Sequence, residues 1–323
     1  MMHPFYVGVD VGAATIKAGI VDDAGHPRSA VNVPTEPNRG STHGLARMCE
    51  AVRAAVKAAS MELHQITAIG VAAPGLLDIP AGVILEAANL PGWRNVAVRE
   101  HVANTFRVPT AFQNDANAAA YGEYWAGAGR GARSLLLLTL GTGIGGGIVF
   151  SDRVLEGAHS HGGEVGHILI EMTNPRLCGC GRRGCLEAYA SATAVVARTR
   201  EALAAGGQSS LRQIPSAELS ARHVFEACAA GDALAAEIVE ETAYYLAVGT
   251  ASLMHVLDPD VVVFGGGMTA AGDSLLARIQ AHVNKLAFPV PAAKTQLCYA
   301  SLGNDAGFIG AAACARQLVR PLA

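Results

Sequence analysis

Three cysteines and one histidine stand close together near the middle of the chain. Their spacing is H-x10-C-x-C-x4-C, with glycines between the cysteines, and the residues are His167, Cys178, Cys180 and Cys185. Three thiolates and one imidazole form a closed tetrahedral ligand set for zinc, and the glycines allow a loop tight enough to bring the sulfurs together. The alternatives are a redox pair or three buried free thiols. The complete set of four ligands favours a structural zinc ion.

Two carboxylates flank this cluster. Glu164 precedes His167 by three residues, and Glu187 follows Cys185 by two. Carboxylates can bind sugar hydroxyls as two-oxygen acceptors. They can equally accept hydrogen bonds that orient metal ligands. The residues alone leave both roles open.

Asn114 and Asp115 stand where a predicted strand meets a predicted helix. In phosphoryl transfer, an aspartate at such a place can accept the proton of an attacking hydroxyl, and an asparagine beside it can bind the neighbouring hydroxyl. The alternative is that either residue serves only as the N-cap of the helix.

Three glycine turns follow apolar strands, at residues 10–15, 141–147 and 265–267. Such turns leave several backbone N–H groups pointing the same way and let a phosphate approach closely. None matches the G-x-x-x-x-G-K-[ST] loop or a G-x-G-x-x-G that opens a helix. A single turn would be read as a tight hairpin, but three together favour a nucleotide site.

Hydroxyl and carboxyl groups accompany two of these turns. Thr15 and Thr142 add hydroxyls that suit a nucleotide triphosphate with its metal ion. Asp10, at the end of the first strand, could hold Mg²⁺ through water, or could only cap its turn.

Apolar periodicity defines the elements that must position these residues. A strand, a glycine turn and a second strand occur twice, so we expect two related α/β halves with a ligand cleft between them. A polar loop is expected over 204–216. Strands are predicted at 5–10, 16–21, 66–72, 107–112, 135–140, 145–150 and 261–264, and helices at 44–59, 116–126, 221–257 (as two helices) and 305–318.

Composition excludes several classes of protein. A chain of 323 residues favours two domains, and a net charge of −3 without a Lys/Arg cluster argues against nucleic acid as partner. The most apolar stretch, 135–150, is broken by five glycines and is too short to span a bilayer. The N-terminus lacks the basic residues of a signal peptide, and the four remaining cysteines are scattered. We therefore expect a cytoplasmic protein without a membrane partner.

Taken in order, these motifs resemble the ROK family of sugar kinases and repressors over almost the whole chain. The resemblance is carried by DVGAATIKAGIVD at 10–22, QNDANAAAYGE at 113–123, TLGTGIGGGIV at 139–149, HGGEVGHI at 161–168, CGCGRRGCLEAYAS at 178–191 and VVVFGGG at 261–267. It implies an α/β, actin-like (ribonuclease H-like) two-lobed ATPase fold with the sugar in the cleft between the lobes. The implied domains are a small lobe, 1–113 with 305–323, and a large lobe, 114–304, that carries the zinc loop.

The resemblance also implies roles for individual residues. Asp115 would be the general base, and His167 would ligate zinc as well as bind sugar. The implied sugar-binding residues are Gly75, Asn89, Asn114, Asp115, Glu164, His167 and Glu187. The implied ATP-binding residues are Asp10, Gly12, Thr15, Lys17, Gly141, Thr142, Gly143, Gly265, Gly266 and Gly267.

ATP with Mg²⁺ is the expected donor, and D-glucose the expected acceptor, giving glucose 6-phosphate. The alternatives are a kinase for N-acetylmannosamine, mannose, fructose or allose, and a non-catalytic sugar-sensing protein. The first motif begins nine residues from the start of the sequence, so we expect no helix-turn-helix before it. A homodimer or homotetramer is expected from the family.

One departure from the family pattern lies in the first turn. Ala13 and Ala14 stand where the family usually has two glycines. The added methyl groups could narrow this turn or weaken nucleotide binding, although Thr15 and Lys17 are retained.

Overall fold

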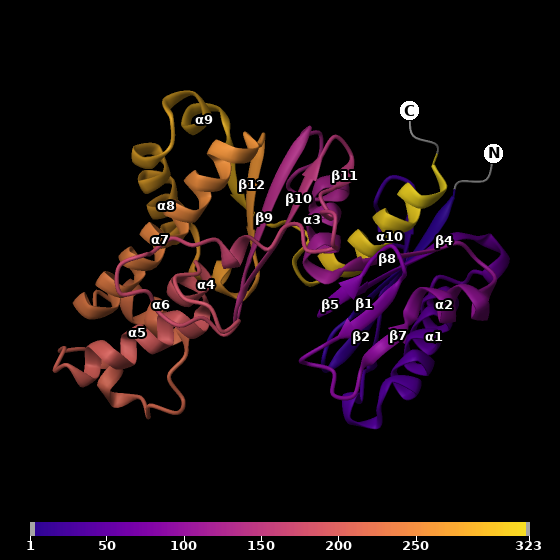
Figure 1. The fold of residues 1–323 in the computed structure, drawn as a ribbon, viewed down its shortest axis with the longest axis horizontal. Helices are drawn as coiled ribbons and strands as arrows, with labels where there is room; N and C mark the ends of the chain where they lie inside the picture. The colour runs from indigo at the N-terminus through magenta and orange to yellow at the C-terminus, as the bar shows by residue number, and fades with distance from the viewer. Residues whose placement is uncertain (1–3, 321–323) are drawn as a thin grey trace. The chain divides into compact units, whose positions relative to one another are not determined.

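The computed structural model describes residues 4–320, which form two five-stranded sheets, one three-stranded sheet and the helices packed on them (Figure 1). These residues divide into two compact units. Unit 1 comprises 4–132, 147–163 and 301–320, and unit 2 comprises 133–146 and 164–300.

The units and the predicted domains assign some residues differently. Residues 114–132, 147–163 and 301–304 belong to unit 1, whereas the predicted large lobe is 114–304. Residues 1–3 and 321–323 of the predicted small lobe lie outside the described residues. The division into functional lobes at 113/114 and 304/305 stays a prediction.

The main sheet of unit 1 has the order β3-β2-β1-β4-β8. The first three strands are antiparallel neighbours, and β4 and β8 continue the sheet in parallel with β1. The strands are β1 (Phe5–Val11), β2 (Thr15–Asp22), β3 (Val31–Pro34), β4 (Ile66–Ala73) and β8 (Thr110–Asn114), and a separate antiparallel sheet contains β5 (Leu76–Asp78), β6 (Val83–Glu86) and β7 (Arg94–Ala97).

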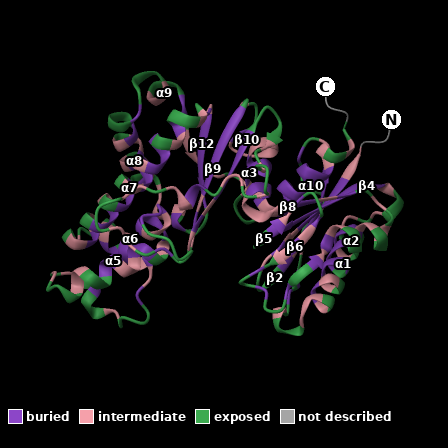
Figure 2. Ribbon diagram, in the orientation of Figure 1, coloured by how far each residue is buried: buried purple, intermediate pink, exposed green. Residues whose placement is uncertain are grey.

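Alternation along β1 directs side chains to two cores. Val7 and Val9 pack with α1 (Ser41–Ala58) and α2 (Val98–Phe106), whereas Tyr6 packs with α10 (Ala306–Val319) on the other face. The helix α3 (Asp115–Ala126) packs beside α10. In Figure 2 the strands of this sheet are mostly buried, and exposed residues line the outer sides of the helices.

Small residues let α10 lie directly on the backbone of the sheet. A Cβ at Gly8 of β1 would lie 1.7 Å from the carbonyl oxygen of Phe308, and one at Gly70 of β4 would lie 1.8 Å from that of Ala311. The alanine-rich composition of α10 serves the same close approach. The strand ends that carry Asp10 and Asn114 are thereby held on a closely packed support.

The second sheet has the order β11-β10-β9-β12-β13, with β9, β12 and β13 parallel. These strands are β9 (Ser134–Leu140), β10 (Ile144–Phe150), β11 (Arg153–Val154), β12 (Val261–Gly265) and β13 (Gln296–Tyr299). The helices of unit 2 are α4 (Glu187–Ala190), α5 (Ala192–Ala204), α6 (Ala221–Ala229), α7 (Ala233–Leu257), α8 (Asp273–Leu286) and α9 (Pro289–Lys294).

Every predicted strand and helix is present, with ends displaced by up to three residues. The predicted loop 204–216 is irregular except for a short 3-10 turn at Ser210–Gln213. The prediction omitted β3, the small sheet, β11, β13, α2, α4, α5, α8 and α9.

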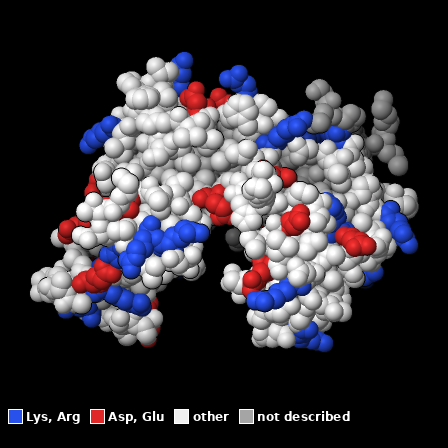
Figure 3. Space-filling model, in the orientation of Figure 1, with Lys and Arg blue, Asp and Glu red and all other residues white. Residues whose placement is uncertain are grey.

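No helix within residues 4–320 is long and apolar enough to cross a membrane. On the face shown in Figure 3, both acidic and basic side chains lie on each unit, and one group of basic side chains lies on the lower part of unit 2.

Candidate functional site

The four predicted metal ligands come together in unit 2. The ligand atoms of His167, Cys178, Cys180 and Cys185 all lie within 4.8 Å of one another. The Sγ atoms of Cys180 and Cys185 are 3.8 Å apart, and Cys178 Sγ is 3.8 Å from His167 Nδ1. A tetrahedral site with Zn–S bonds of about 2.3 Å has edges of about 3.8 Å, so the residues fit zinc.

Local turns shape the cysteine loop. Gly181 and Gly184 have φ values of 82° and 87°, a left-handed conformation that glycine adopts without strain. The Gly181 N–H donates to the Cys178 carbonyl, and the Cys178 N–H donates to the Arg182 carbonyl. The loop therefore folds back on itself around Cys180, the second cysteine.

The thiols differ in their surroundings. Burial raises the pKa of Cys178 and of Cys185, because the charged thiolate is disfavoured away from water. Cys180 is exposed, and a hydrogen bond from the backbone N–H of Arg182 lowers its pKa. A bound cation would stabilise all three thiolates.

The two ring nitrogens of His167 have different neighbours. Nδ1 faces Cys178, whereas Nε2 lies 4.0 Å from Oε2 of Glu164, whose side chain is largely exposed. One nitrogen is thus placed for a metal and the other faces away from the cysteines. Glu164 precedes the 3-10 turn that carries His167, Val165–His167.

Glu187 connects the cysteine loop to the second glycine turn. Its Oε1 lies 3.2 Å from Cys178 Sγ, and its Oε2 accepts a hydrogen bond of 2.9 Å from the backbone N–H of Ile144. A Cβ at Gly143 would lie 2.3 Å from that same Oε2, so a side chain there would displace the carboxylate from this position. The Cys178 thiol is the donor in this contact, so the contact belongs to the protonated cysteine and not to a metal-bound thiolate.

The first glycine turn joins β1 and β2. Asp10 and Lys17 are direct partners across this hairpin, and the Gly12 N–H donates to the Thr15 carbonyl over 3.0 Å. Ala13 and Ala14 are both exposed, and neither is among the described residues with positive φ. The turn therefore closes without requiring glycine at either alanine.

Asp10 is an electrostatically unusual carboxyl group in unit 1. Burial, followed by the negative charge of Asp115, raises its pKa to about 6, and Lys17 opposes this shift. The Lys17 ammonium itself pairs with Asp305, donates to the Asn304 carbonyl and lies over the ring of Phe308. Lys17 is thereby anchored to the start of α10.

The structure gives Asn114 the role of helix cap. Its Oδ1 accepts hydrogen bonds from the backbone N–H groups of Ala116 and Asn117, over 3.0 and 3.1 Å, which leaves its amide nitrogen for a ligand. Asp115 occupies the first turn of α3, where the helix dipole favours a carboxylate. Its Oδ1 also accepts from the Ala116 N–H, over 2.8 Å.

Gln113, which the sequence reasoning did not select, holds this strand end. It is buried, its Oε1 accepts from the Asn114 N–H over 2.8 Å, and its Nε2 donates to Glu156 over 2.8 Å. The sequence signal that could have identified Gln113 is its place directly before Asn114 and Asp115.

Gly75 and Asn89 are both exposed in the segments around the small sheet, and Gly75 has a φ of 106°.

The third glycine turn borders a pocket in unit 2. Gly265 ends β12, and Gly266, with a φ of 87°, lies so close to Leu140 that a Cβ would be 2.6 Å from its carbonyl oxygen. A pocket of about 690 Å³ begins at these turns. Its lining includes Gly141, Thr142, Gly267 and three residues that the sequence reasoning missed, Phe225, Glu226 and Met268.

Two α/β units with glycine turns after their strands define the class of two-lobed, actin-like ATPase folds. The chain belongs to the ROK family, whose sequence model matches residues 6–318. Both the family and the fold class predicted from the motifs are thus confirmed.

Individual relatives cover almost the whole chain. A protein described as a glucokinase from Halalkalibacterium halodurans is 38% identical over 312 residues, which are 96% of this chain and 94% of that protein. The crystal structure of a ROK hexokinase from Thermus thermophilus is 34% identical, covers 98% of this chain and 99% of its own, and has a TM-score of 0.84. A ROK family glucokinase from Streptomyces griseus, solved in complex with glucose and AMPPNP, is 33% identical with a TM-score of 0.77, covering 97% of this chain and 99% of its own.

Proposed function

We propose that this protein is an ATP-dependent sugar kinase that converts D-glucose to glucose 6-phosphate. The observation that carries the proposal is the similarity, over 97% of the chain, to a glucokinase whose structure contains glucose and an ATP analogue. The carboxylate, the glycine turns and the Cys/His cluster support it, because each is a group that the reaction or its fold requires.

Asp115 is the proposed general base. It would take the proton from the 6-hydroxyl of the sugar as that oxygen attacks the γ-phosphorus of ATP, and the bond from the γ-phosphorus to the bridging oxygen would break to release ADP. Its position in the first turn of α3 supports this role, since a helix N-terminus favours the negative charge that a general base carries.

Polar side chains would bind the hydroxyl groups of the sugar. The Asn114 amide nitrogen, which is not used in capping, would donate to one hydroxyl. Glu164, Glu187 and His167 Nε2 would bind others, while Gly75 and Asn89 would line the site. Zinc bound to His167 Nδ1 and the three thiolates would act as a structural cross-link that fixes the His167 ring.

ATP would bind through the three glycine turns. Gly12, Thr15, Gly141, Thr142 and Gly143 would contact the phosphates, and Asp10 would hold Mg²⁺ through water. Gly265, Gly266 and Gly267 would face the adenosine, and the adjoining pocket of about 690 Å³ has room for it. Lys17, anchored by Asp305, would contribute positive charge near the phosphates.

A coupled assay of ADP release tests the proposal. Purified protein with Mg-ATP would be given glucose, mannose, fructose, allose, glucosamine, N-acetylglucosamine or N-acetylmannosamine at one concentration. We expect glucose to give the highest turnover. Turnover dominated by another sugar would show a kinase with a different substrate, whereas no turnover with any sugar would favour a sugar-sensing protein.

The homodimer or homotetramer and the cytoplasmic location stay predictions. Gel filtration tests the oligomeric state.

A further inference from the structure

In each glycine turn assigned to the phosphates, two backbone carbonyl groups accept hydrogen bonds from a nearby segment that contains a threonine. In the first turn, the Gly12 carbonyl accepts a hydrogen bond from the Thr35 hydroxyl over 2.7 Å, and the Ala14 carbonyl accepts from the Thr35 N–H over 3.0 Å. Thr35 directly follows β3 and is completely buried. One residue thus holds two carbonyl oxygens of a three-residue turn.

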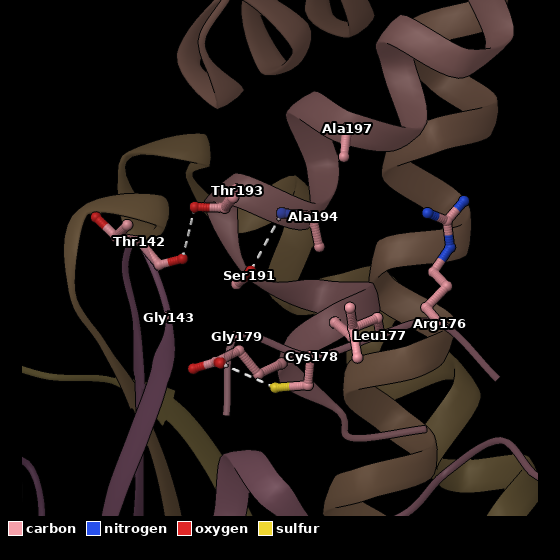
Figure 4. A pocket seen from close by; sticks show the side chains of 12 residues that line it. Thr142, Gly143, Arg176, Leu177, Cys178, Gly179, Ser191, Thr193, Ala194 and Ala197 are labelled. Atoms are coloured by element: carbon pink, nitrogen blue, oxygen red, sulfur yellow. Dashed lines mark hydrogen bonds between the residues drawn. The ribbon is translucent and has the colours of Figure 1, made fainter. Parts of the chain in front are cut away.

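The second turn has the same arrangement, built from a different element. The Thr142 carbonyl accepts from the Thr193 hydroxyl over 2.8 Å, and the Gly141 carbonyl accepts from the Ala192 N–H over 2.9 Å. Thr193 lies in the first turn of α5, and Figure 4 shows its hydroxyl directed at the Thr142 carbonyl. We call Thr35 and Thr193, with these hydrogen bonds, the threonine braces.

Each turn is also closed by a backbone hydrogen bond, which spans three residues in the first turn and two in the second. The N–H of its first glycine donates to a carbonyl across the turn, from Gly12 to Thr15 and from Gly141 to Gly143, with both distances 3.0 Å. The two turns lie in different units and follow different strands. The pattern therefore occurs once in each unit, after β1 and after β9.

Peptide geometry links the braces to anion binding. A trans peptide is planar, so its C=O and the N–H of the next residue point in opposite directions. Carbonyl groups of Gly12 and Ala14 that point to Thr35 direct the N–H groups of Ala13 and Thr15 away from it. Carbonyl oxygens would repel a phosphate, whereas N–H groups attract one.

The same argument applies to the second turn. Carbonyl groups of Gly141 and Thr142 that point to α5 direct the N–H groups of Thr142 and Gly143 away from that helix. We propose that Thr35 and Thr193 are positioning residues for the phosphates of ATP, which orient the carbonyl groups of the two turns toward the protein and the N–H groups toward the nucleotide. This inference rests on the proposed kinase function, and in it each threonine acts through the turn whose carbonyl groups it holds.

Substitution by valine removes each hydroxyl and keeps the shape of the side chain. We expect Thr193→Val to raise the KM for ATP about threefold and Thr35→Val about tenfold, the larger effect following from the complete burial of Thr35. The KM for the sugar should change by less than about twofold, because the turns contact the nucleotide. Thr35→Ser and Thr193→Ser restore the hydroxyl and should return the KM for ATP to near the wild-type value.

Matched controls are available in both units. Thr199 lies on α5 like Thr193, is buried, and its hydroxyl donates to the Val195 carbonyl of its own helix. Thr110 is buried in unit 1, and its hydroxyl donates to the Val108 carbonyl. Thr199→Val and Thr110→Val should leave the KM for ATP unchanged, and the comparison is made with brace variants that have the same melting temperature as these controls.

Nucleotide binding separates the two proposals. Isothermal titration with Mg-AMPPNP would measure affinity without turnover, beside the melting temperature of each variant. Valine variants that bind Mg-AMPPNP as tightly as wild type would overturn the positioning role. Variants with a lower melting temperature whose affinities for sugar and for nucleotide fall by the same factor would overturn it as well. A wild-type protein that binds Mg-AMPPNP but phosphorylates no sugar would refute the kinase proposal alone, and one that binds no nucleotide would refute both.

Discussion

The carboxylate of Glu123 on α3 binds both the backbone N–H and the hydroxyl of Ser301, over 3.1 and 3.3 Å. The same carboxylate, completely buried, accepts from the N–H groups of Leu302 and Ala128, each over 2.8 Å. Residue 301 is the point where the chain enters unit 1 for the last time. One side chain thus fixes this entry point to α3, the helix that begins with Asp115.

Glu123→Gln should destabilise unit 1 strongly. The amide nitrogen of glutamine would face backbone N–H groups that need an acceptor, and buried donors left without one are costly. We expect the free energy of unfolding to fall by about 2–4 kcal/mol, measured by urea denaturation. Glu237→Gln, an exposed glutamate on α7, is the control and should change stability by less than about 0.5 kcal/mol. Equal stability of Glu123→Gln and wild type would contradict the assigned role.

Asp10 should make the ligand-free protein less stable as the pH rises. Its pKa of about 6 in the folded protein lies above the ordinary value of 3.8, so the folded state binds the proton more tightly than the unfolded state. The stabilisation is complete below pH 3.8 and is lost as the pH rises through about 6. The loss is about 3 kcal/mol, because each pKa unit corresponds to about 1.4 kcal/mol.

Asp10→Asn removes this titration. Relative to wild type, the variant should gain thermal stability between about pH 4 and 7 and then keep a constant advantage. Melting temperatures of both proteins across this range measure the difference. A difference that does not change with pH would show that Asp10 does not titrate in this way.

Removing one thiolate should remove the proposed zinc. We expect elemental analysis to find about one zinc ion per wild-type chain and almost none in Cys180→Ser, because the closed set of four ligands is then broken. The melting temperature should fall by roughly 5 °C or more. Cys228→Ser, at a cysteine on α6 outside the cluster, is the control. Wild-type protein purified without chelators and free of zinc would refute the metal assignment.

The sequence predicted those parts of the site that depend on neighbours along the chain. His167 and the three cysteines stand within 19 residues, so their spacing alone indicated that they bind one metal ion. The glycine turns were also visible, because each stands directly after an apolar strand in the sequence. The Glu187 carboxylate reaches Ile144, 43 residues away, and no local pattern could have placed that contact. Thr35 and Thr193 were missed for the same reason, since nothing beside them marks a threonine that binds a distant turn.

The elements that were missed also have physical explanations. The strands of the small sheet contain three or four residues each, too few to establish an alternation. The helix α8 could have been found, because Leu275, Ile279 and Val283 repeat every four residues and all are buried. Asn114 shows why a residue type does not assign a single role. Its side-chain oxygen caps α3, and this capping leaves the amide nitrogen for a second role.

Asp115→Asn should separate catalysis from binding. The amide keeps the shape and hydrogen-bonding reach of the side chain but cannot accept the sugar proton, so we expect kcat to fall about 10²–10⁴-fold with the glucose Kd nearly unchanged. The variant should also lower the pKa of Asp10, because the Asp115 charge contributes to raising it. Asp273→Asn, at an exposed aspartate in the first turn of α8, is the matched control. Normal turnover by Asp115→Asn would exclude it as the base.

The two alanines of the first turn should be compatible with full activity. Ala13 and Ala14 are exposed, neither is among the described residues with positive φ, and the carbonyl of Ala14 is already held by Thr35. Restoring the usual pair of glycines with Ala13→Gly and Ala14→Gly should therefore change the KM for ATP by less than about threefold. Each glycine should lower the free energy of unfolding by about 0.4–1 kcal/mol, because it gives the unfolded chain more conformations to lose. A large gain in ATP affinity in the double variant would instead show that the methyl groups obstruct the phosphates.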